Sequence, residues 1–272
     1  MENIPDSLTK VIDSPSEYLY CYKSERSSIN IIENKSLMFS SLGKLNDPIE
    51  NTLQTFFLDL DTRFTQSEVK EYSDLLKSFT KKYCNEYVKV LCFTQSKKPD
   101  ERSLISQSHI GYMRFSMWSQ YAENGKGVCF IFNRRELDKE FEVLIKSENI
   151  FGKSGTVIYT EDYVHNMAFR FMYDEVKSLK IGHNILKPKI EKYFRQYFFK
   201  KRVDWSNELE YRYLIVSDRI MNLGIQKSLC GIIFGYNASN ELITRISLAK
   251  EFDGIPKASI QLQGYHAYIK GI

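Results

Sequence analysis

The chain has 272 residues, of which 43% are hydrophobic and 26% charged, with a formal net charge of +4. That composition excludes a low-complexity chain and is ordinary for a globular protein that buries a sizeable core. The mild positive charge, whose densest runs are Lys81-Lys82 and Lys200-Lys201-Arg202, does not indicate a dedicated DNA-binding protein.

Further features of the sequence narrow the class of protein. The five cysteines form no Cys-x-x-Cys pair and the four histidines lack zinc-ligand spacing. We therefore expect thiols in a reducing cytosol and no bound metal. No run approaches the roughly 18 apolar residues of a membrane-spanning helix, and the N-terminus lacks the pattern of a signal peptide. We expect a soluble, cytoplasmic protein with no membrane partner.

The 18 Tyr and 18 Phe residues predict many half-buried rings, which line either a ligand pocket or an aromatic-rich sheet. Alternation and helical spacing predict the elements in chain order. In the first half these are strands at 18–23, 37–41 and 88–94, and helices at 26–34 and 67–87. Asn46 and Asp47 predict a turn after the second strand, because both side chains bond to local backbone and Pro48 fixes φ.

In the second half, residues 117–122 predict a helical turn, whose Trp118 either walls a pocket or joins the core. The elements that follow are a strand at 128–132, a helix at 134–141, a strand at 155–159, two helical patterns between 161 and 201, a strand to residue 216, a strand at 229–235, a helix at 240–252 and a strand at 259–268. About six to eight short strands with helices between them predict an α+β fold. We expect one domain over residues 1–272, with a compact mixed or antiparallel sheet core and a helical insertion at about 161–201.

The segment at 205–216 combines charged side chains with strong β-propensity. In a strand, alternate side chains share a face, so we expect Glu208, Glu210 and Arg212 on one side. Leu209 and the aromatic and apolar residues that alternate with the charged ones would then lie on the other side. Two carboxylates and a guanidinium on one face form either a reactive site or a structural ion network, and the sequence leaves both open.

Four motifs occur along the chain in a characteristic order. They are Leu19-Tyr20-Cys21-Tyr22-Lys23, then Leu45-Asn46-Asp47-Pro48-Ile49-Glu50, then Met117-Trp118-Ser119-Gln120-Tyr121-Ala122 with Lys126-Gly127-Val128-Cys129, and last Lys200 with Trp205-Ser206-Asn207-Glu208-Leu209-Glu210-Tyr211-Arg212. In this order they resemble the bacterial family known as domain of unknown function 2971, and residues 231–235 fit its closing strand. Members of that family are associated with phage-defence and toxin-like contexts, so the resemblance implies such a role.

More loosely, the chain resembles ADP-ribosyltransferases, which place a Glu-x-Glu motif or a single Glu at the start of a late strand. The resemblance implies that Glu210 is the catalytic glutamate, that Glu208 is its upstream partner, and that NAD is the substrate. It also implies an ADP-ribosyltransferase-like fold and a protein or nucleic-acid acceptor. In those enzymes a residue of the first strand and a Ser or aromatic residue of a central segment complete the site. The residues implied at these places are Tyr22, Lys23, Trp118 and Ser119.

Cleavage of the nicotinamide–ribose bond passes through an oxocarbenium-like state, as glycoside cleavage does. Glu210 would stabilise the developing positive charge and bind a ribose hydroxyl, and Glu208 would orient or deprotonate the nucleophile. Lys23 or Arg212 would hold the diphosphate, and aromatic rings would stack on nicotinamide. The remaining candidates for the substrate pocket are Asn46, Asp47, Trp118, Tyr121 and Trp205.

Two other functions stay open on the sequence alone. A non-catalytic ligand sensor or interaction domain with an aromatic pocket is favoured by the lack of Arg or His within 18–23. A metal-dependent nuclease would require Asp47, Glu50 and Glu208 to converge in space. A toxic activity would also require a trigger, for which we expect a regulatory partner.

Overall fold

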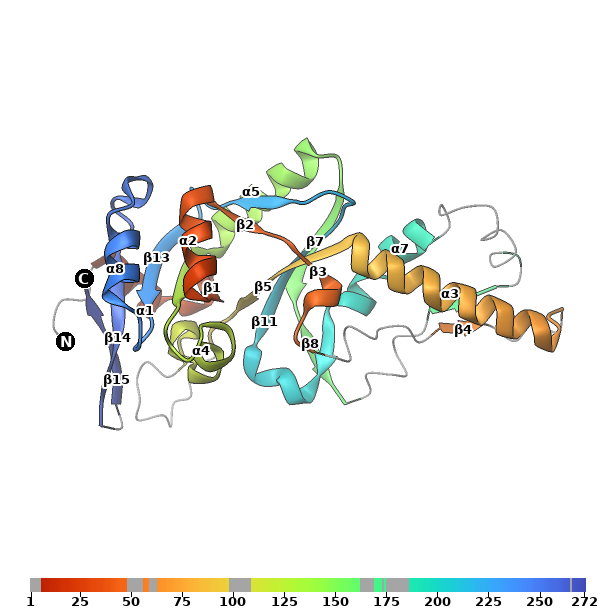
Figure 1. Ribbon diagram of the computed structural model, residues 1–272, viewed down its shortest axis with the longest axis horizontal. Coiled ribbons are helices and arrows are strands. Elements are labelled where there is room, and N and C mark those ends of the chain that lie inside the picture. Colours follow the sequence, from red (N-terminus) through yellow and green to blue (C-terminus); the bar gives the residue numbers. More distant parts are fainter. Residues whose placement is uncertain are drawn as a thin grey trace.

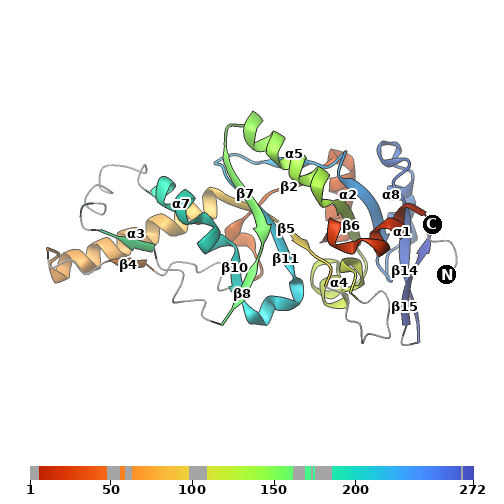
Figure 2. The same ribbon diagram turned by 180° about the vertical axis from the view of Figure 1, so that it is seen from behind.

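A nine-stranded sheet runs through the centre of the molecule (Figures 1 and 2). The computed structural model describes residues 6–47, 56–58, 63–97, 109–161, 169–172, 174, 186–264 and 266–272. In spatial order the strands are β15 (His266–Gly271), β14 (Lys257–Gln263), β13 (Leu229–Phe234), β6 (Val128–Asn133), β1 (Tyr18–Lys23), β5 (Val88–Thr94), β11 (Glu210–Val216) and β7 (Phe151–Thr156), with β3 (Ser40–Ser41) paired to β5 off this path. β13 and β14 run parallel and the other neighbours run antiparallel. The predicted α+β class with a mixed sheet core is confirmed.

Short strand pairs and helices surround this sheet. The described residues also form two-stranded sheets of β10 (Lys200–Arg202) with β8 (Ile158–Thr160), β12 (Asn222–Gly224) with β2 (Ser36–Met38), and β4 (Phe56–Leu58) with β9 (Phe169–Phe171). The α-helices are α1 (Asp6–Asp13), α2 (Glu25–Asn34), α3 (Gln66–Glu86), α4 (Phe115–Tyr121), α5 (Arg134–Ser147), α7 (Leu186–Phe198) and α8 (Asn240–Ser247). The 3-10 helices are η1 (Pro15–Glu17), η2 (Leu42–Lys44), η4 (Gly111–Met113), η5 (Val203–Glu208) and η6 (Lys250–Phe252). Along the long axis, α3 and α7 lie toward one end and α8, β14 and β15 toward the other (Figure 1).

Side-chain caps set where several helices begin. At the start of α3, the Thr65 hydroxyl accepts a hydrogen bond from the Glu68 backbone, and the Glu68 carboxylate accepts one from the Thr65 backbone, which is a capping box. The N-cap of α8 is Ser239, whose hydroxyl accepts a hydrogen bond from the backbone N–H of Leu242. The first helical residue is therefore Asn240, which directly follows the N-cap residue.

Three predicted segments fold differently from the sequence pattern. The predicted strand at 259–268 is the hairpin of β14 and β15, because Gly264 adopts φ +58° and reverses the chain. The predicted strand at 155–159 is divided into β7 and β8 on either side of Val157. Residues 169–171, predicted as helix, are strand β9 because they pair with β4. The rest of that predicted helix, at 162–168, 173 and 175–185, lies outside the described residues.

The prediction of six to eight strands is too low, because several strands have only two or three residues. Such pieces carry no readable alternation in the sequence, and their pairing partners are distant in the chain. β3, for example, pairs with β5 through Ser40 opposite Val90 and Ser41 opposite Lys89. These short strands matter for the site, since β3 and β10 flank it.

One face of the sheet is a continuous apolar core. Tyr211, Tyr213 and Ile215 of β11 lie on this face with Leu91 and Phe93 of β5. Helices α2, α5 and α8 cover it, because each contributes buried apolar side chains to the same cluster. Alternation along β11 therefore places its aromatic residues in the core, as the sequence predicts.

The opposite face carries two separate apolar clusters. One packs α3 and α7 on Val88 and Val90 of β5 and on Leu214 and Val216 of β11. The other packs α1, η4 and α4 on the inner strands, including Tyr20 of β1. The polar residues of this face lie between the two clusters.

The sheet opens between β1 and β5. β1 pairs with β6 along its whole length, and β5 pairs with β11 along its whole length. β1 and β5 share a single described residue pair, Tyr20 with Thr94. Beyond that pair, β5 is joined by β3 instead. The two halves of the sheet thus meet at one point and leave a wedge between them.

Candidate functional site

A row of three polar side chains crosses the point where the halves of the sheet meet. Thr94, the last residue of β5, lies opposite Tyr20 of β1 and opposite Glu210, the first residue of β11. Directly opposed residues on antiparallel strands have their Cβ atoms about 4.5–5.5 Å apart. The register therefore brings the sequence-predicted glutamate level with Tyr20 of the first strand, with Thr94 of β5 between them.

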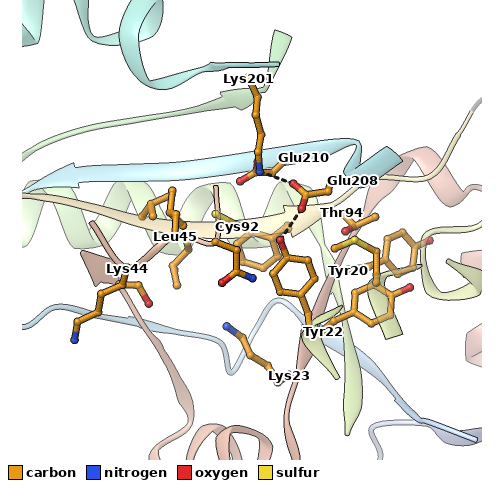
Figure 3. A pocket seen from close by; sticks show the side chains of 17 residues that line it. Tyr20, Tyr22, Lys23, Lys44, Leu45, Cys92, Thr94, Lys201, Glu208 and Glu210 are labelled. Atoms are coloured by element: carbon orange, nitrogen blue, oxygen red, sulfur yellow. Dashed lines mark hydrogen bonds and ion pairs between the residues drawn. The ribbon is translucent and has the colours of Figure 1, made fainter. Parts of the chain in front are cut away.

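A cavity of about 240 Å³ occupies the wedge beside this row (Figure 3). Its walls are aromatic and apolar on the sheet side, with charged groups at two places. The lining residues are Tyr20, Tyr22, Lys23, Ser40, Lys44, Leu45, Asn46, Val90, Leu91, Cys92, Phe93, Thr94, Met117, Tyr121, Lys201, Glu208 and Glu210. An apolar cavity with a few convergent polar groups is the usual form of a small-molecule site.

Glu210 forms a buried, two-pronged ion pair with Arg212. The Nε and Nη2 atoms of Arg212 each donate to one carboxylate oxygen of Glu210 at 2.7 Å. Arg212 also donates from Nη1 to the carbonyl of Phe198 at 2.9 Å and is completely buried. Burial by itself would raise the pKa of Glu210, but Arg212 and then Lys201 outweigh it and hold that pKa below its ordinary value. Glu210 is therefore an ionised carboxylate at neutral pH, at the wall of the cavity.

Glu208 reaches the same cavity from a different element. It is the last residue of η5, and Leu209 then takes a left-handed conformation with φ +44° before β11 begins. The prediction that Glu208, Glu210 and Arg212 share one strand face is wrong for Glu208, because this turn interrupts the alternation. Glu208 is nevertheless held in the wall, where the Tyr121 hydroxyl donates to it at 2.5 Å. Burial and the adjacent carboxylate raise the pKa of Tyr121, so its hydroxyl stays neutral and donates.

Lys201 joins the two carboxylates. Its Nζ atom lies 2.7 Å from Glu208 and 3.6 Å from Glu210, and its side chain is 5% exposed. The same Nζ lies 4.5 Å from the centre of the Trp205 ring, within cation–π distance. Two lone carboxylates this close would repel each other, and the ammonium between them removes that cost. The sequence does not single out this residue, because the run Lys200-Lys201-Arg202 has the pattern of an ordinary charged surface.

The first strand supplies the opposite wall. Tyr22 lies in the lining, donates from its hydroxyl to the carbonyl of Gly111, and meets Trp118 edge to face at 5.0 Å between ring centres. Lys23 follows it and is half-buried. Burial raises the pKa of Tyr22 well above its ordinary value, so it is a neutral phenol. The predicted residues Tyr22, Lys23 and Asn46 are thus brought together with Glu210.

Five predicted site residues do not line the cavity. Trp118 is completely buried in the core, with its ring nitrogen bonded to the carbonyl of Tyr112 at 2.8 Å. Its neighbours in α4, Met117 and Tyr121, are the residues that face the cavity, since a helix turns by about 100° per residue. Ser119 is exposed and bonds to Asn124. The others are Asp47, which is buried elsewhere, Trp205, which lies beneath Lys201, and Arg212, which lies behind Glu210.

Arg212 therefore does not reach a ligand in the cavity, contrary to the expectation that it would hold a diphosphate. Its guanidinium donates hydrogen bonds to Glu210 and to the backbone carbonyl of Phe198. Lys44 and Thr94 line the cavity instead and were not singled out in the sequence. Alternation in β5 does place Val90, Cys92 and Thr94 on one face, so the sequence could have indicated that Thr94 shares a face with the other two. Alternation does not show which strands pair with β5, and so it could not place Thr94 beside Glu210.

Three further observations bear on other chemistries. Within the described ranges, no three His, Cys, Asp or Glu side chains are grouped as metal ligands would be. Glu50, which the nuclease interpretation needs, lies outside those ranges. No disulfide joins the five cysteines, all of which are described. In the part of the chain that the structure covers, no helix is both long and apolar enough to cross a bilayer.

Comparison with known proteins gives one match. Residues 117–213 match the family described as "Protein of unknown function (DUF2971)". A search of curated proteins and a search of solved structures each gave no match. The matched segment runs from α4 into β11 and includes Tyr121, Lys201, Glu208 and Glu210, so it contains the charged wall of the cavity. The resemblance stated from the sequence is confirmed for this segment: residues 117–213 match the model of the DUF2971 family, whose proteins have no known function.

Proposed function

We propose that the chain is an NAD-consuming enzyme, an ADP-ribosyltransferase or NAD glycohydrolase, with Glu210 as its catalytic carboxylate. The observation that supports this most is the row Tyr20–Thr94–Glu210, which sets an ionised glutamate at the start of a late strand, one strand away from the first strand, at the wall of an aromatic cavity. The ADP-ribosyltransferase resemblance expects this combination. The acceptor is water for a glycohydrolase, or a nucleophile of a protein or nucleic acid for a transferase.

The charges of the site suit this reaction. When the bond between nicotinamide and ribose breaks, its electron pair leaves with the nicotinamide nitrogen and the ribose carbon becomes cationic. Glu210 is already ionised because Arg212 and Lys201 lower its pKa, so it stabilises that cation without first losing a proton. The oxygen nucleophile then bonds to the ribose carbon and releases its proton. Glu208, 5% exposed, is the second carboxylate in the lining of the cavity and would take up that proton.

A specific observation favours the alternative of a ligand-binding domain without catalysis. Both oxygens of Glu210 are engaged by Arg212, and both oxygens of Glu208 are engaged, one by Tyr121 and one by Lys201. Carboxylates held on both oxygens in this way are typical of structural ion networks. In that case the cavity binds its ligand unchanged, and the network serves to hold η5 on the sheet.

A set of three variants separates catalysis from structure. Glu210→Gln leaves Arg212 buried without an anion, and Arg212→Met leaves Glu210 paired with Lys201; each breaks the ion pair, at a cost of about 3–5 kcal/mol. The double variant Glu210→Gln/Arg212→Met removes both charges, so it should be more stable than either single variant. The measurement is nicotinamide release from NAD, together with the midpoint of urea unfolding for each protein.

The proposal expects nicotinamide release to fall by about 10²–10³-fold in Glu210→Gln and to stay equally low in the more stable double variant. Arg212→Met, which keeps the carboxylate, should retain clearly more activity than Glu210→Gln at matched fractions of folded protein. If activity instead follows stability and returns in the double variant, Glu210 is structural. If the wild-type protein binds NAD and releases no nicotinamide, the ligand-binding alternative holds.

A further inference from the structure

The cavity has two chemically different ends. On one side, Lys201, Glu208 and Glu210 come together, and on the other side lie Lys23 and Lys44, apart from each other (Figure 3). The charges of the first end balance within the protein, because two carboxylates meet Lys201 and Arg212. This end of the cavity therefore does not attract a charged group of a ligand.

The lysine end has the opposite character. Among the described residues no carboxylate lies within ion-pair distance of the amine of Lys23 or of Lys44. Lys23 is half-buried at the end of β1 and extends into the cavity, while Lys44 is exposed at its rim (Figure 3). Two cations at the mouth of a cavity, without a carboxylate to pair with, attract an anionic group of a ligand. Phosphate is the anion that lysine binds as a point charge.

Thr94 provides an independent sign of a ligand between these ends. Thr94 is 1% exposed and lines the cavity, and its buried hydroxyl has no hydrogen-bond partner in the described part of the chain. A buried hydroxyl without a partner is unfavourable, and proteins seldom leave one unsatisfied. Thr94 lies directly opposite Glu210, whose carboxylate has room for about two more hydrogen bonds beyond the two from Arg212. The Thr94 hydroxyl can both donate and accept a hydrogen bond, and the Glu210 carboxylate can accept one. Together they can bind two neighbouring hydroxyl groups of a sugar.

We infer that the cavity binds a ribose 5-phosphate group, the sugar phosphate half of a nucleotide, with its hydroxyls at Thr94 and Glu210 and its phosphate at Lys23 and Lys44. The cavity volume of about 240 Å³ is below the roughly 300–1,000 Å³ of pockets that enclose whole drug-sized ligands. It therefore takes one half of a dinucleotide and leaves the rest outside. The inference rests on the proposed function for the orientation of the ligand, with its sugar toward Glu210 and its phosphate toward the lysines, because that function requires the ribose to lie beside Glu210.

Binding of fragments tests both ends without any reaction. Titration calorimetry would compare ribose, ribose 5-phosphate and inorganic phosphate on four proteins. These are the wild type, Thr94→Val, the double variant Lys23→Met/Lys44→Met, and the control Lys146→Met, which removes an exposed lysine of α5. Thermal unfolding of each protein verifies that it is folded. Thr94→Val keeps the shape of the side chain and removes its hydroxyl.

We expect the wild type to bind ribose 5-phosphate at least about tenfold more tightly than ribose, because the phosphate makes charge-assisted contacts. The lysine variant should abolish that difference, and Lys146→Met should keep it. Thr94→Val should weaken ribose and ribose 5-phosphate alike, by about threefold to tenfold, and leave phosphate unchanged. The inference is overturned if the wild type binds ribose and ribose 5-phosphate equally tightly, or if it shows no measurable binding of ribose 5-phosphate. It is also overturned if Lys146→Met loses the preference for ribose 5-phosphate as fully as the lysine variant does.

Nicotinamide release, measured on the same proteins, keeps this result separate from the proposed function. If NAD is cleaved while the lysine variant binds ribose 5-phosphate as the wild type does, the phosphate end is wrong and the function stands. If ribose 5-phosphate binds as expected and NAD is not cleaved, the proposed function fails and the sugar phosphate site stands.

Discussion

Four buried charged residues give the site its character at the residue scale. Lys201 and Arg212 balance Glu208 and Glu210, and all four side chains are at most 7% exposed. Burying charges is costly, and the cost is recovered only when every charge has a partner at close range. The distances of 2.7 Å from Lys201 to Glu208 and from Arg212 to Glu210 meet that condition. Each member of the group therefore depends on the others.

The lowered pKa of Glu210 predicts how stability changes in acid. Its carboxylate is stabilised in the fold, so its contribution is fully present above the pKa of about 4.3 of an unfolded glutamate. That contribution is lost as pH falls through the lower pKa of the folded state. Glu210→Gln/Arg212→Met lacks this contribution, and we expect its melting temperature to fall less steeply than the wild type's below about pH 4. Melting curves between pH 6 and pH 3 that run parallel for the two proteins would contradict this.

Lys201 acts with Arg212 to hold the pKa of Glu210 below its ordinary value. In Lys201→Met, Glu210 loses one of these two cations, so its pKa rises. We expect the acid limb of the pH–rate profile for NAD cleavage to move to higher pH by about one unit or more. Lys200→Met, which changes the adjacent lysine outside the cavity lining, is the control. An acid limb at the same pH in both variants would show that Lys201 has no such role.

At the scale of elements, the site depends on a sheet that opens between β1 and β5. β6 holds β1 along its full length and β11 holds β5 along its full length, so the wedge has two firm sides. The turn at Leu209 then directs η5 across the open end and delivers Glu208. The cavity is thus formed by strand pairing and by one left-handed residue, and it needs no long loop among the described residues.

Gly127 tests this arrangement, because it lies between the ends of β1 and β6. A Cβ atom at this position would lie 2.0 Å from the backbone carbonyl oxygen of Lys23, a contact that a flexible side chain cannot relieve. We expect Gly127→Ala to destabilise the protein by about 1–3 kcal/mol and to weaken ribose 5-phosphate binding through displacement of Lys23. Gly224→Ala, which has open space around it, should change stability by less than about 0.5 kcal/mol. Similar urea midpoints for the two variants would contradict the prediction.

At the scale of the whole molecule, one sheet carries all three apolar clusters. One cluster covers one face under α2, α5 and α8, and two cover the other face on either side of the cavity. β5 and β11 contribute side chains to clusters on both faces, so neither face unfolds without exposing the other. The single domain over residues 1–272 stays a prediction, and the shared sheet leads us to expect that the described part unfolds as one unit.

The two tryptophans allow that prediction to be measured. Trp118 reports on the cluster beneath α4, and Trp205 reports on η5 at the far side of the cavity. In Trp118→Phe and Trp205→Phe, each remaining tryptophan gives a separate fluorescence signal. We expect both signals and far-ultraviolet circular dichroism to change in one coincident urea transition, because the shared sheet couples them. An earlier transition of Trp205 would show that the region around η5 unfolds by itself.

The sequence by itself determined the features that depend on nearest neighbours in the chain. The strands at 18–23, 88–94 and 128–132, the long amphipathic helix and the aromatic face of β11 follow from alternation and helical spacing. It also determined that a glutamate stands at the start of a late strand, which made Glu210 the leading candidate. Local propensity and burial pattern suffice for such features, because they act over a few residues.

Only the tertiary structure decided which side chains share the cavity. Thr94, Lys44 and Lys201 join Glu210 because β1, β5, β10 and η2 come together across long stretches of chain. The same packing buried Arg212 behind Glu210, set Trp118 in the core, and moved Glu208 off the strand at Leu209. Alternation predicts on which face of the sheet a side chain lies, but it does not predict which strand pairs with which. Strand pairing is set by the burial of both faces of the whole sheet.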